Sequence, residues 1–193
     1  MKNIDLYLDL DGIILRRTGR TAGKGRNEFA IAPGAMDFLS WAIDHFNCYW
    51  LTSRSHDGGY GGIERAFRFA VSANSLPEEI MMVIHAIVPA PWGKLKIEGI
   101  DQSRNFYWID DNPDKDSVAA LEAAGKSSRL IIASTDERPD DLTRVREALE
   151  AATANQRDVA QLQTFMKEIN SGEELSTEVA QWGSVAKFCP AFH

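Results

Sequence analysis

The 193-residue sequence has little cysteine and no excess of basic side chains. Its two cysteines are Cys48 and Cys189, and Cys48 lies in a strongly apolar stretch. A disulfide scaffold is therefore disfavoured, and we expect a reducing compartment, the cytoplasm. The 28 acidic side chains outnumber the 21 basic ones, which gives a formal net charge of −7. Proteins that bind nucleic acid tightly carry the opposite charge, so we expect no stable complex with nucleic acid.

Long apolar runs are also missing. No segment approaches the roughly 20 apolar residues that a membrane-spanning helix requires. The first residues carry charges at Lys2 and Asp5 and no apolar signal-peptide core, so we expect a protein that is neither membrane-bound nor exported. No internal repeat or low-complexity run is present. A chain of 193 residues with 44% hydrophobic content suffices for one compact core with a short appendage.

What the sequence does contain is an alternation of short apolar strands and amphipathic helices. Strands are expected at residues 4–10, 48–53, 106–110 and 129–133. Helices are expected at residues 33–46, 63–73, 94–100, 118–125 and 142–152. The apolar stretch 80–91 fits a helix or a strand equally well. This alternation predicts the α/β class, with a parallel sheet between two layers of helices, a three-layer α/β/α sandwich.

Two polar, glycine-rich segments are predicted as surface loops. The first, residues 16–27, holds five basic side chains that could steer a phosphorylated ligand or simply be solvated: Arg16, Arg17, Arg20, Lys24 and Arg26. The second, residues 53–61, contains His56, which is either idle or close to a leaving group. Residues 1–153 are predicted as the core and residues 154–193 as a C-terminal helical extension packed on it. The oligomeric state is left open.

Polar side chains follow three of the predicted strands. They are Asp9 and Asp11 after the first strand, Thr52 and Ser53 after the second, and Asp110 and Asp111 after the third. Ligands of parallel sheets bind at the carboxyl ends of strands, so these side chains are expected to share one crevice. Carboxylates repel one another by roughly 4 kcal/mol per pair at 4 Å if the effective dielectric is near 20. Oxygen ligands of this kind predict a Mg²⁺ site, whereas the simpler alternative is that each Asp only terminates a strand.

These residues carry a resemblance to a known family. LYLDLDGIIL resembles the first motif of the haloacid dehalogenase (HAD) superfamily, a hydrophobic strand followed by Asp-x-Asp-Gly. WLTS is similar to the second motif, Lys94 is placed like the lysine of the third, and WIDDNP is similar to the acidic fourth motif. The resemblance covers residues 4–133, with all four motifs in order. It implies a HAD-like, Rossmannoid fold, and the segments between the motifs are too short for a large cap domain, so we expect a small cap or none.

The resemblance also implies an activity, that of a Mg²⁺-dependent phosphomonoester hydrolase working through an aspartyl-phosphate. Asp9 is expected to be the nucleophile and Asp11 the general acid and base. The family's metal ligands correspond to the Asp9 carboxylate, the Asp11 backbone carbonyl and an acid of the fourth motif. Asp110 is the first choice for that acid and Asp111 is given a supporting role, although the order of the two is left open.

Two further catalytic residues are expected. The hydroxyl of Thr52 is predicted to hydrogen-bond the transferring phosphoryl group, and Lys94 to neutralise the phosphorylated intermediate. Lys96 competes for the second role, but Lys94 is preferred because it opens the helix expected at this point. The residues predicted to bind substrate are Gly12, Ser53 and Arg54.

The acid at position 11 favours a phosphatase over a dehalogenase, because dehalogenases of the superfamily lack an acid there. The expected substrate is a phosphorylated small molecule, a nucleotide, or the phosphorylated end of a nucleic acid. A phosphotransferase acting on an alcohol is an alternative, and so is a phosphoprotein phosphatase, because Asp-Asp-Asn-Pro is similar to capless members that act on proteins. A binding protein without turnover is the alternative from another functional class.

Overall fold

The computed structural model describes residues 3–20 and 27–154. The chain divides into two units, residues 1–146 and 147–193. Of the second unit only residues 147–154 are described, and they are helical. Except for residue 154, the predicted C-terminal extension lies outside the described residues, as do Lys24 and Arg26. The predictions made for these segments therefore stay predictions.

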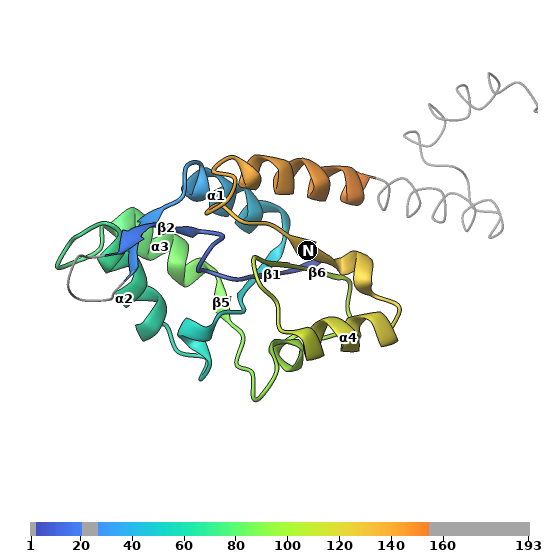
Figure 1. Ribbon diagram of the computed structural model, residues 1–193. Helices are drawn as coiled ribbons and strands as arrows, with labels where there is room; N and C mark the ends of the chain where they lie inside the picture. Colours follow the sequence, from blue (N-terminus) through green and yellow to red (C-terminus); the bar gives the residue numbers. More distant parts are fainter. Residues whose placement is uncertain (1–2, 21–26, 155–193) are drawn as a thin grey trace, which may run out of the picture. The chain divides into compact units, whose positions relative to one another are not determined.

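Five short strands of the first unit form one parallel sheet with the order β5-β4-β1-β6-β7 (Figure 1). The strands are β1 Asp5–Leu8, β4 Asn47–Trp50, β5 Val88–Pro89, β6 Phe106–Asp110 and β7 Leu130–Ile132. Every residue of β1 and of β6 is buried, as in parallel sheets that are covered on both faces. The predicted α/β class with a parallel sheet is thereby confirmed.

Helices connect these strands. They are α1 Ala35–His45, α2 Gly61–Ala70, α3 Glu78–Ala86 and α4 Lys115–Ala123, and a further helix begins at residue 141. The start of α4 is capped by Asp114, whose side chain accepts a hydrogen bond from the backbone N–H of Ser117. Gly125, at a φ of +67°, follows its end, as predicted for a C-terminal cap. In the described ranges no helix has both the length and the apolar character that crossing a membrane requires.

Side chains alternate between the two faces of the sheet and so determine which helix covers each face. Tyr7 and Trp108 lie on one face and join a buried core cluster with Leu121 of α4. On the opposite face the indole Nε1 of Trp50 donates a hydrogen bond of 3.1 Å to the carbonyl of Ile84 in α3. Figure 1 shows α1 and α4 on opposite sides of β1 and β6. The sheet therefore has helices on both of its faces.

An antiparallel hairpin precedes α1, where the sequence predicted a surface loop over residues 16–27. It consists of β2 Leu15–Arg20 and β3 Asn27–Ile31, with Arg17 opposite Phe29. For residues 16–20 and 27 the loop prediction is wrong, because glycine is depleted in strands on average whereas tertiary contacts decide the conformation here. Residues 21–26 of the predicted loop lie outside the described residues. β3 packs against α2, and the Arg17 guanidinium lies 3.2 Å from the carboxylate of Asp136.

The apolar stretch 80–91 contains both a helix and a strand. α3 ends at Ala86, Ile87 is already extended at a φ of −108°, and β5 follows at once. The helix expected at residues 94–100 is a 3₁₀ turn, η2, at Lys96–Gly99, and a second such turn, η1, occupies Ser53–Ser55. A strand of two residues is too short to show a period, which explains why periodicity could not separate it from the helix.

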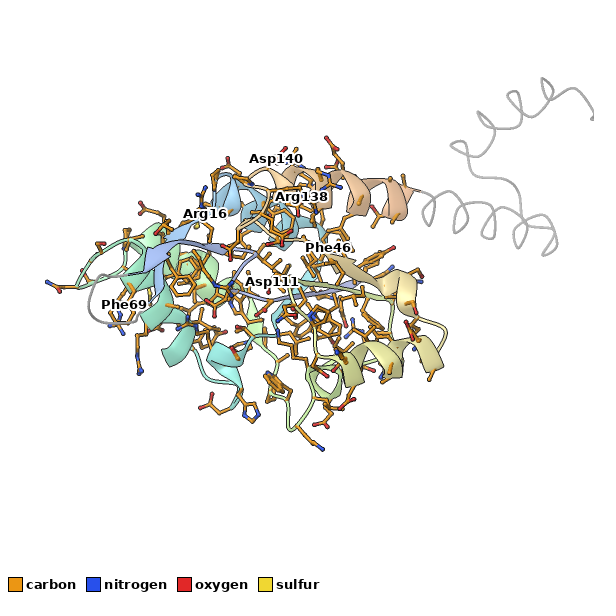
Figure 2. The ribbon with its side chains drawn as sticks, viewed as in Figure 1. Arg16, Phe46, Phe69, Asp111, Arg138 and Asp140 are labelled. Atoms are coloured by element: carbon orange, nitrogen blue, oxygen red, sulfur yellow. The ribbon has the colours of Figure 1, made fainter. Side chains whose placement is uncertain are left out.

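The carboxylate of Asp141 holds the segment between β7 and the helix that begins at residue 141. Its buried carboxylate accepts a 2.8 Å hydrogen bond from the backbone N–H of Ser134 and pairs with Arg138, labelled in Figure 2. Burial by itself raises the pKa of Asp141, but these hydrogen bonds outweigh it and hold the pKa below its usual value. The charged form therefore stabilises the fold above the usual pKa, and this stabilisation is lost as the pH falls through the lowered value.

We predict that Asp141→Asn lowers the free energy of unfolding at neutral pH by about 1.5–3 kcal/mol, the typical range for hydrogen bonds to a charged group. The difference from the wild type should shrink as the pH falls from about 5 to about 3. Urea denaturation at several pH values measures both effects. Asp140→Asn, at the exposed neighbouring position, is the matched control and should cost much less. A deficit for Asp141→Asn that stays constant down to the lowest pH would contradict this account.

Candidate active site

The chain order brings three strand ends together at the carboxyl edge of the sheet. The chain first adds β4 and β5 on one side of β1 and then returns to add β6 and β7 on the other. A reversal of this kind opens a crevice at the carboxyl ends of the central strands. Asp9 follows β1, Thr52 follows β4, and Asp110 is the last residue of β6. The backbone N–H of Asp9 still donates to the carbonyl of Ile109 at 3.0 Å, so β1 and β6 stay in register up to the site.

Asp9, Asp110 and Asp111 form an acidic group at this edge. Each of them offers one carboxylate oxygen, and these oxygens all lie within 4.8 Å of one another. Asp9 is 6% exposed and Asp110 is fully buried. Asp111, labelled in Figure 2, is half-buried and directly follows β6. The structure thus brings together three of the four acids that the sequence predicts to share a crevice.

A lysine binds two members of the acidic group, and it is Lys96. Its Nζ lies 2.8 Å from Oδ2 of Asp9 and 2.6 Å from Oδ2 of Asp110. Lys94, the lysine preferred from the sequence, is exposed, and its backbone N–H donates to the carboxylate of Glu98. The expectation that Lys94 occupies this position is wrong because it assumed a helix starting at Lys94, whereas the 3₁₀ turn starts two residues later.

Hydrogen bonds from the start of α4 hold the turn that carries Lys96. The hydroxyl of Ser117 accepts from the backbone N–H of Ile97 at 3.1 Å and donates to Oδ2 of Asp114 at 2.7 Å. Burial raises the pKa of Asp114, but hydrogen bonds from Ser117 and from the backbone N–H of Lys96 outweigh it and leave the pKa below its usual value. Neither residue was predicted from the sequence, although an Asp directly before a helix is a recognisable N-cap.

Burial and repulsion raise the pKa values of the acidic group. The pKa of Asp9 is raised to about 6, by burial first and by the charge of Asp110 second, while Lys96 opposes the shift. Burial is also the largest cause of the raised pKa of Asp110 and of Asp111. Burial of Lys96 lowers its pKa, but its two carboxylate partners outweigh this effect and raise it, so its ammonium stays charged. One lysine therefore compensates only part of the charge of three carboxylates.

The acidic group offers the type of ligand that a hard divalent cation prefers. Its donors are all carboxylate oxygens, the type preferred by Mg²⁺ and Ca²⁺. The carboxylate of Asp111 makes no hydrogen bond within the part of the chain that the structure describes, so both of its oxygens are available as ligands. The uncompensated charge and these available oxygens fit a bound cation.

Gly12 allows Asp111 to reach the acidic group. Its φ of +76° lies in the left-handed region that glycine tolerates best. A Cβ at this position would lie 2.2 Å from Oδ2 of Asp111, well inside contact distance. The carbonyl of Gly12 accepts hydrogen bonds from the backbone N–H of Thr135 at 2.7 Å and from its hydroxyl at 3.0 Å. Thr135 follows β7 and adds a fourth strand end to the site, one that the sequence analysis did not single out.

The carboxylate of Asp11 pairs with Arg54 and is not part of the acidic group. Nε of Arg54 lies 2.8 Å from Oδ2 of Asp11, and Nη2 lies 3.0 Å from Oδ1, a bidentate arrangement. The same guanidinium lies over the ring of Phe29 in β3, 5.3 Å from its centroid. Arg54, predicted to bind substrate, is thus joined to the predicted general acid. The metal contact expected of Asp11 uses its backbone carbonyl and stays a prediction.

Thr52 and Ser53 differ in their surroundings. Thr52 is fully buried, and its hydroxyl oxygen accepts the backbone N–H of Arg54 at 3.3 Å. Its carbonyl accepts the indole N–H of Trp92, also at 3.3 Å. Ser53 is exposed, and among the described residues no hydrogen bond joins it to the acidic group. Thr52 is therefore buried and hydrogen-bonded in the turn after β4, whereas Ser53 lies on the surface.

Of the basic residues at 16–27, Arg17 reaches the edge of the site. Burial raises the pKa of Asp111, and the nearby charge of Arg17 opposes this shift. Arg17 also pairs with Asp136, a residue after β7 that the sequence analysis did not single out. His56 is bound to the segment after β5, because one of its ring nitrogens lies 2.6 Å from the carbonyl oxygen of Gly93.

Comparison of the sequence with models of known protein families finds no match, and comparison with curated proteins finds none either. A function therefore has to be inferred from the residues of the site. Those residues are a buried acidic group at a strand-end crevice, a lysine that bridges two of its members, and an acid held by an arginine.

We predict that the metal-free protein becomes more stable as the pH falls from about 7.5 to about 5.5. The pKa of Asp9 is about 6 in the folded chain and 3.8 in its ordinary state. Asp9 of the native state therefore takes up a proton in this range, whereas Asp9 of the unfolded chain does not, and this difference raises the free energy of unfolding. The raised pKa values of Asp110 and Asp111 act in the same direction. Urea denaturation with a chelator present measures the slope.

Asp9→Asn removes one titrating group and should reduce this slope. Asp37→Asn, at an exposed position of α1, is the matched control and should leave the slope unchanged. A wild-type protein that gains stability as the pH rises over the same range would show that the site does not carry the charge described above.

Proposed function

We propose that this protein is a Mg²⁺-dependent phosphomonoester hydrolase of the HAD type that works through a phosphorylated Asp9. The observation that carries the proposal is the position of the Asp9 carboxylate, which shares the ammonium of Lys96 with Asp110 and meets Asp111 in one acidic group. The central place of β1 in the parallel sheet supports it, because Asp9 then lies in the strand-end crevice. The four motifs that resemble the superfamily support the same proposal.

Asp9, Asp110 and Asp111 are the residues that would hold the metal ion, with the backbone carbonyl of Asp11 as a further ligand. When bound, Mg²⁺ supplies the positive charge that screens Asp9 from the phosphoryl oxygens of the substrate. Lys96 adds a fixed positive charge from the side of Asp110. A phosphate dianion can then approach a nucleophile that is itself an anion.

Asp9 performs the first step. One of its carboxylate oxygens forms a bond to phosphorus while the bond from phosphorus to the leaving oxygen breaks. As general acid, Asp11 carries a proton on one oxygen while the other accepts from Arg54, and it gives this proton to the leaving oxygen. The leaving group then departs as an alcohol, and Asp11 becomes a carboxylate. The ammonium of Lys96 and the hydroxyl of Thr52 stabilise the charge on the transferring phosphoryl group.

Water performs the second step with the help of Asp11. The Asp11 carboxylate takes a proton from the water molecule as its oxygen bonds to phosphorus, and the bond between phosphorus and Asp9 breaks. Inorganic phosphate leaves, and both side chains return to their starting states. An alcohol in place of water would make the enzyme a phosphotransferase, which product analysis with added acceptor alcohols distinguishes.

The test is a panel of phosphomonoesters assayed with Mg²⁺ and with a chelator. We expect hydrolysis of 4-nitrophenyl phosphate and of at least one class among sugar phosphates, nucleotides, phosphorylated oligonucleotide ends and phosphopeptides. Chelation should abolish the activity, and Asp9→Asn should reduce kcat by at least about a thousandfold because no phosphoenzyme forms. Asp37→Asn is the charge-matched control. Binding of these phosphates without any turnover by the wild type would instead favour a binding protein.

The two lysines give a second kinetic test. Lys96→Met should lower kcat by about a hundredfold or more, the usual cost of removing one group that stabilises transition-state charge. Lys94→Met should stay within about twofold of the wild type, because Lys94 is exposed and its side chain does not reach the acidic group. Circular dichroism verifies that both variants are folded. Equal effects of the two substitutions would contradict the assignment of Lys96.

A further inference from the structure

Arg54 uses only one edge of its guanidinium to hold Asp11. That edge consists of Nε–H and one N–H of Nη2. The other edge, made of Nη1 and the second N–H of Nη2, keeps its donors, because within the described residues Nη1 makes no hydrogen bond. The side chain is 32% exposed, so a molecule in solution can reach this second edge. Arginine forks of this geometry bind phosphate or carboxylate groups through two parallel hydrogen bonds.

The structure holds this guanidinium in place before any ligand arrives. A Cβ on Gly62 would lie 1.9 Å from the backbone oxygen of Arg54, so α2 packs directly on the Arg54 backbone. The backbone N–H of Arg54 donates to the hydroxyl of Thr52, and its guanidinium contacts both the carboxylate of Asp11 and the ring of Phe29. A group fixed from three directions loses little conformational entropy when an anion binds to it.

The pairing with Asp11 also determines which part of a substrate the second edge would meet. In the proposed reaction Asp11 contacts the leaving oxygen, whereas Asp9 attacks from the opposite side of phosphorus. Lys96 belongs to the side of the nucleophile, because its Nζ binds Asp9 and Asp110. Arg54, bound to Asp11, therefore belongs to the side of the leaving group.

We propose that the second edge of Arg54 binds an anionic group on the alcohol portion of the substrate, so that the preferred substrates are phosphomonoesters with a second phosphate or carboxylate a few bonds from the scissile one. This inference rests on the proposed hydrolase function. The pairing between Arg54 and Asp11 then serves two purposes, since it orients the acid and presents a fixed positive charge to the leaving group. The same pair of anions occurs in small bisphosphates and at the phosphorylated end of a nucleic acid.

The test compares α,ω-alkanediol bisphosphates of two to five carbons with the alkyl monophosphates of equal length. The leaving alcohol is the same in each pair apart from the second anion. We expect kcat/KM to favour at least one bisphosphate by about tenfold or more, beyond the factor of two from its two equivalent ends. A dinucleotide with a terminal phosphate, set against the same dinucleotide with a neutral methylphosphonate linkage, shows whether a nucleic-acid end supplies the second anion.

Arg54→Met should bring the ratio of kcat/KM between the bisphosphate and the monophosphate of each pair close to the statistical value of two. Because both members of a pair are measured with the same variant, any damage to the orientation of Asp11 cancels in the ratio. Arg65→Met, at an exposed position of α2, removes the same charge outside the site and should preserve the wild-type preference. If Arg54 had only a structural role, Arg54→Met would lower kcat/KM equally for both substrates of a pair and leave the ratio of the two values unchanged.

A direct binding measurement separates this inference from the hydrolase proposal. Titration calorimetry of the best bisphosphate into Asp9→Asn should show tighter binding than into Asp9→Asn combined with Arg54→Met, by about tenfold. Turnover of monophosphates without a preference for any second anion would overturn the inference alone. Absence of Mg²⁺-dependent turnover with every ester would overturn the hydrolase proposal and this inference with it.

Discussion

The ammonium of Lys96 between the carboxylates of Asp9 and Asp110 is the interaction on which the site depends. A buried charge is costly unless it is paired, and here two nearly inaccessible acids share one cation while a third acid stands beside them. The remaining negative charge raises the pKa of Asp9 to about 6. A protein that keeps this arrangement accepts an electrostatic cost that a proton or a metal ion relieves. Strongly raised carboxyl pKa values of this kind are concentrated at functional sites.

Three parts of the chain that are distant in sequence produce this interaction. The turn after β1 contributes Asp9 and places Gly12 where Asp111 can approach, and the end of β6 contributes both acids of the third strand. The 3₁₀ turn η2, which precedes β6, contributes Lys96, and hydrogen bonds at the start of α4 hold this turn. The scaffold therefore fixes the charged groups through backbone hydrogen bonds before any ligand binds, which is the condition for electrostatic catalysis.

Much of the fold and part of the site could be predicted because local patterns carry them. Short buried strands that end in polar residues indicate the parallel sheet, and the carboxyl ends of its strands indicate where Asp9 and Asp110 meet. The choice between Lys94 and Lys96 could not be made in this way, because both lysines suit a helix start and only the position of α4 decides which turn forms. The hairpin escaped prediction for a related reason, since β2 pairs with β3 and β3 packs against α2, contacts that the residue preferences of these strands do not indicate.

The sequence by itself determined the alternation of strands and helices, the acids at the strand ends, and the glycine that turns the chain after β1. These are local properties, which follow from hydrophobic periodicity and from the conformational preferences of single residues. Only the tertiary structure decided that Lys96 bridges Asp9 and Asp110, that Arg54 binds Asp11, and that Thr135 ties the end of β7 to Gly12. These contacts join separate segments of the chain, and the order of the strands together with the hydrogen bonds at the start of α4 brings these segments within reach of one another.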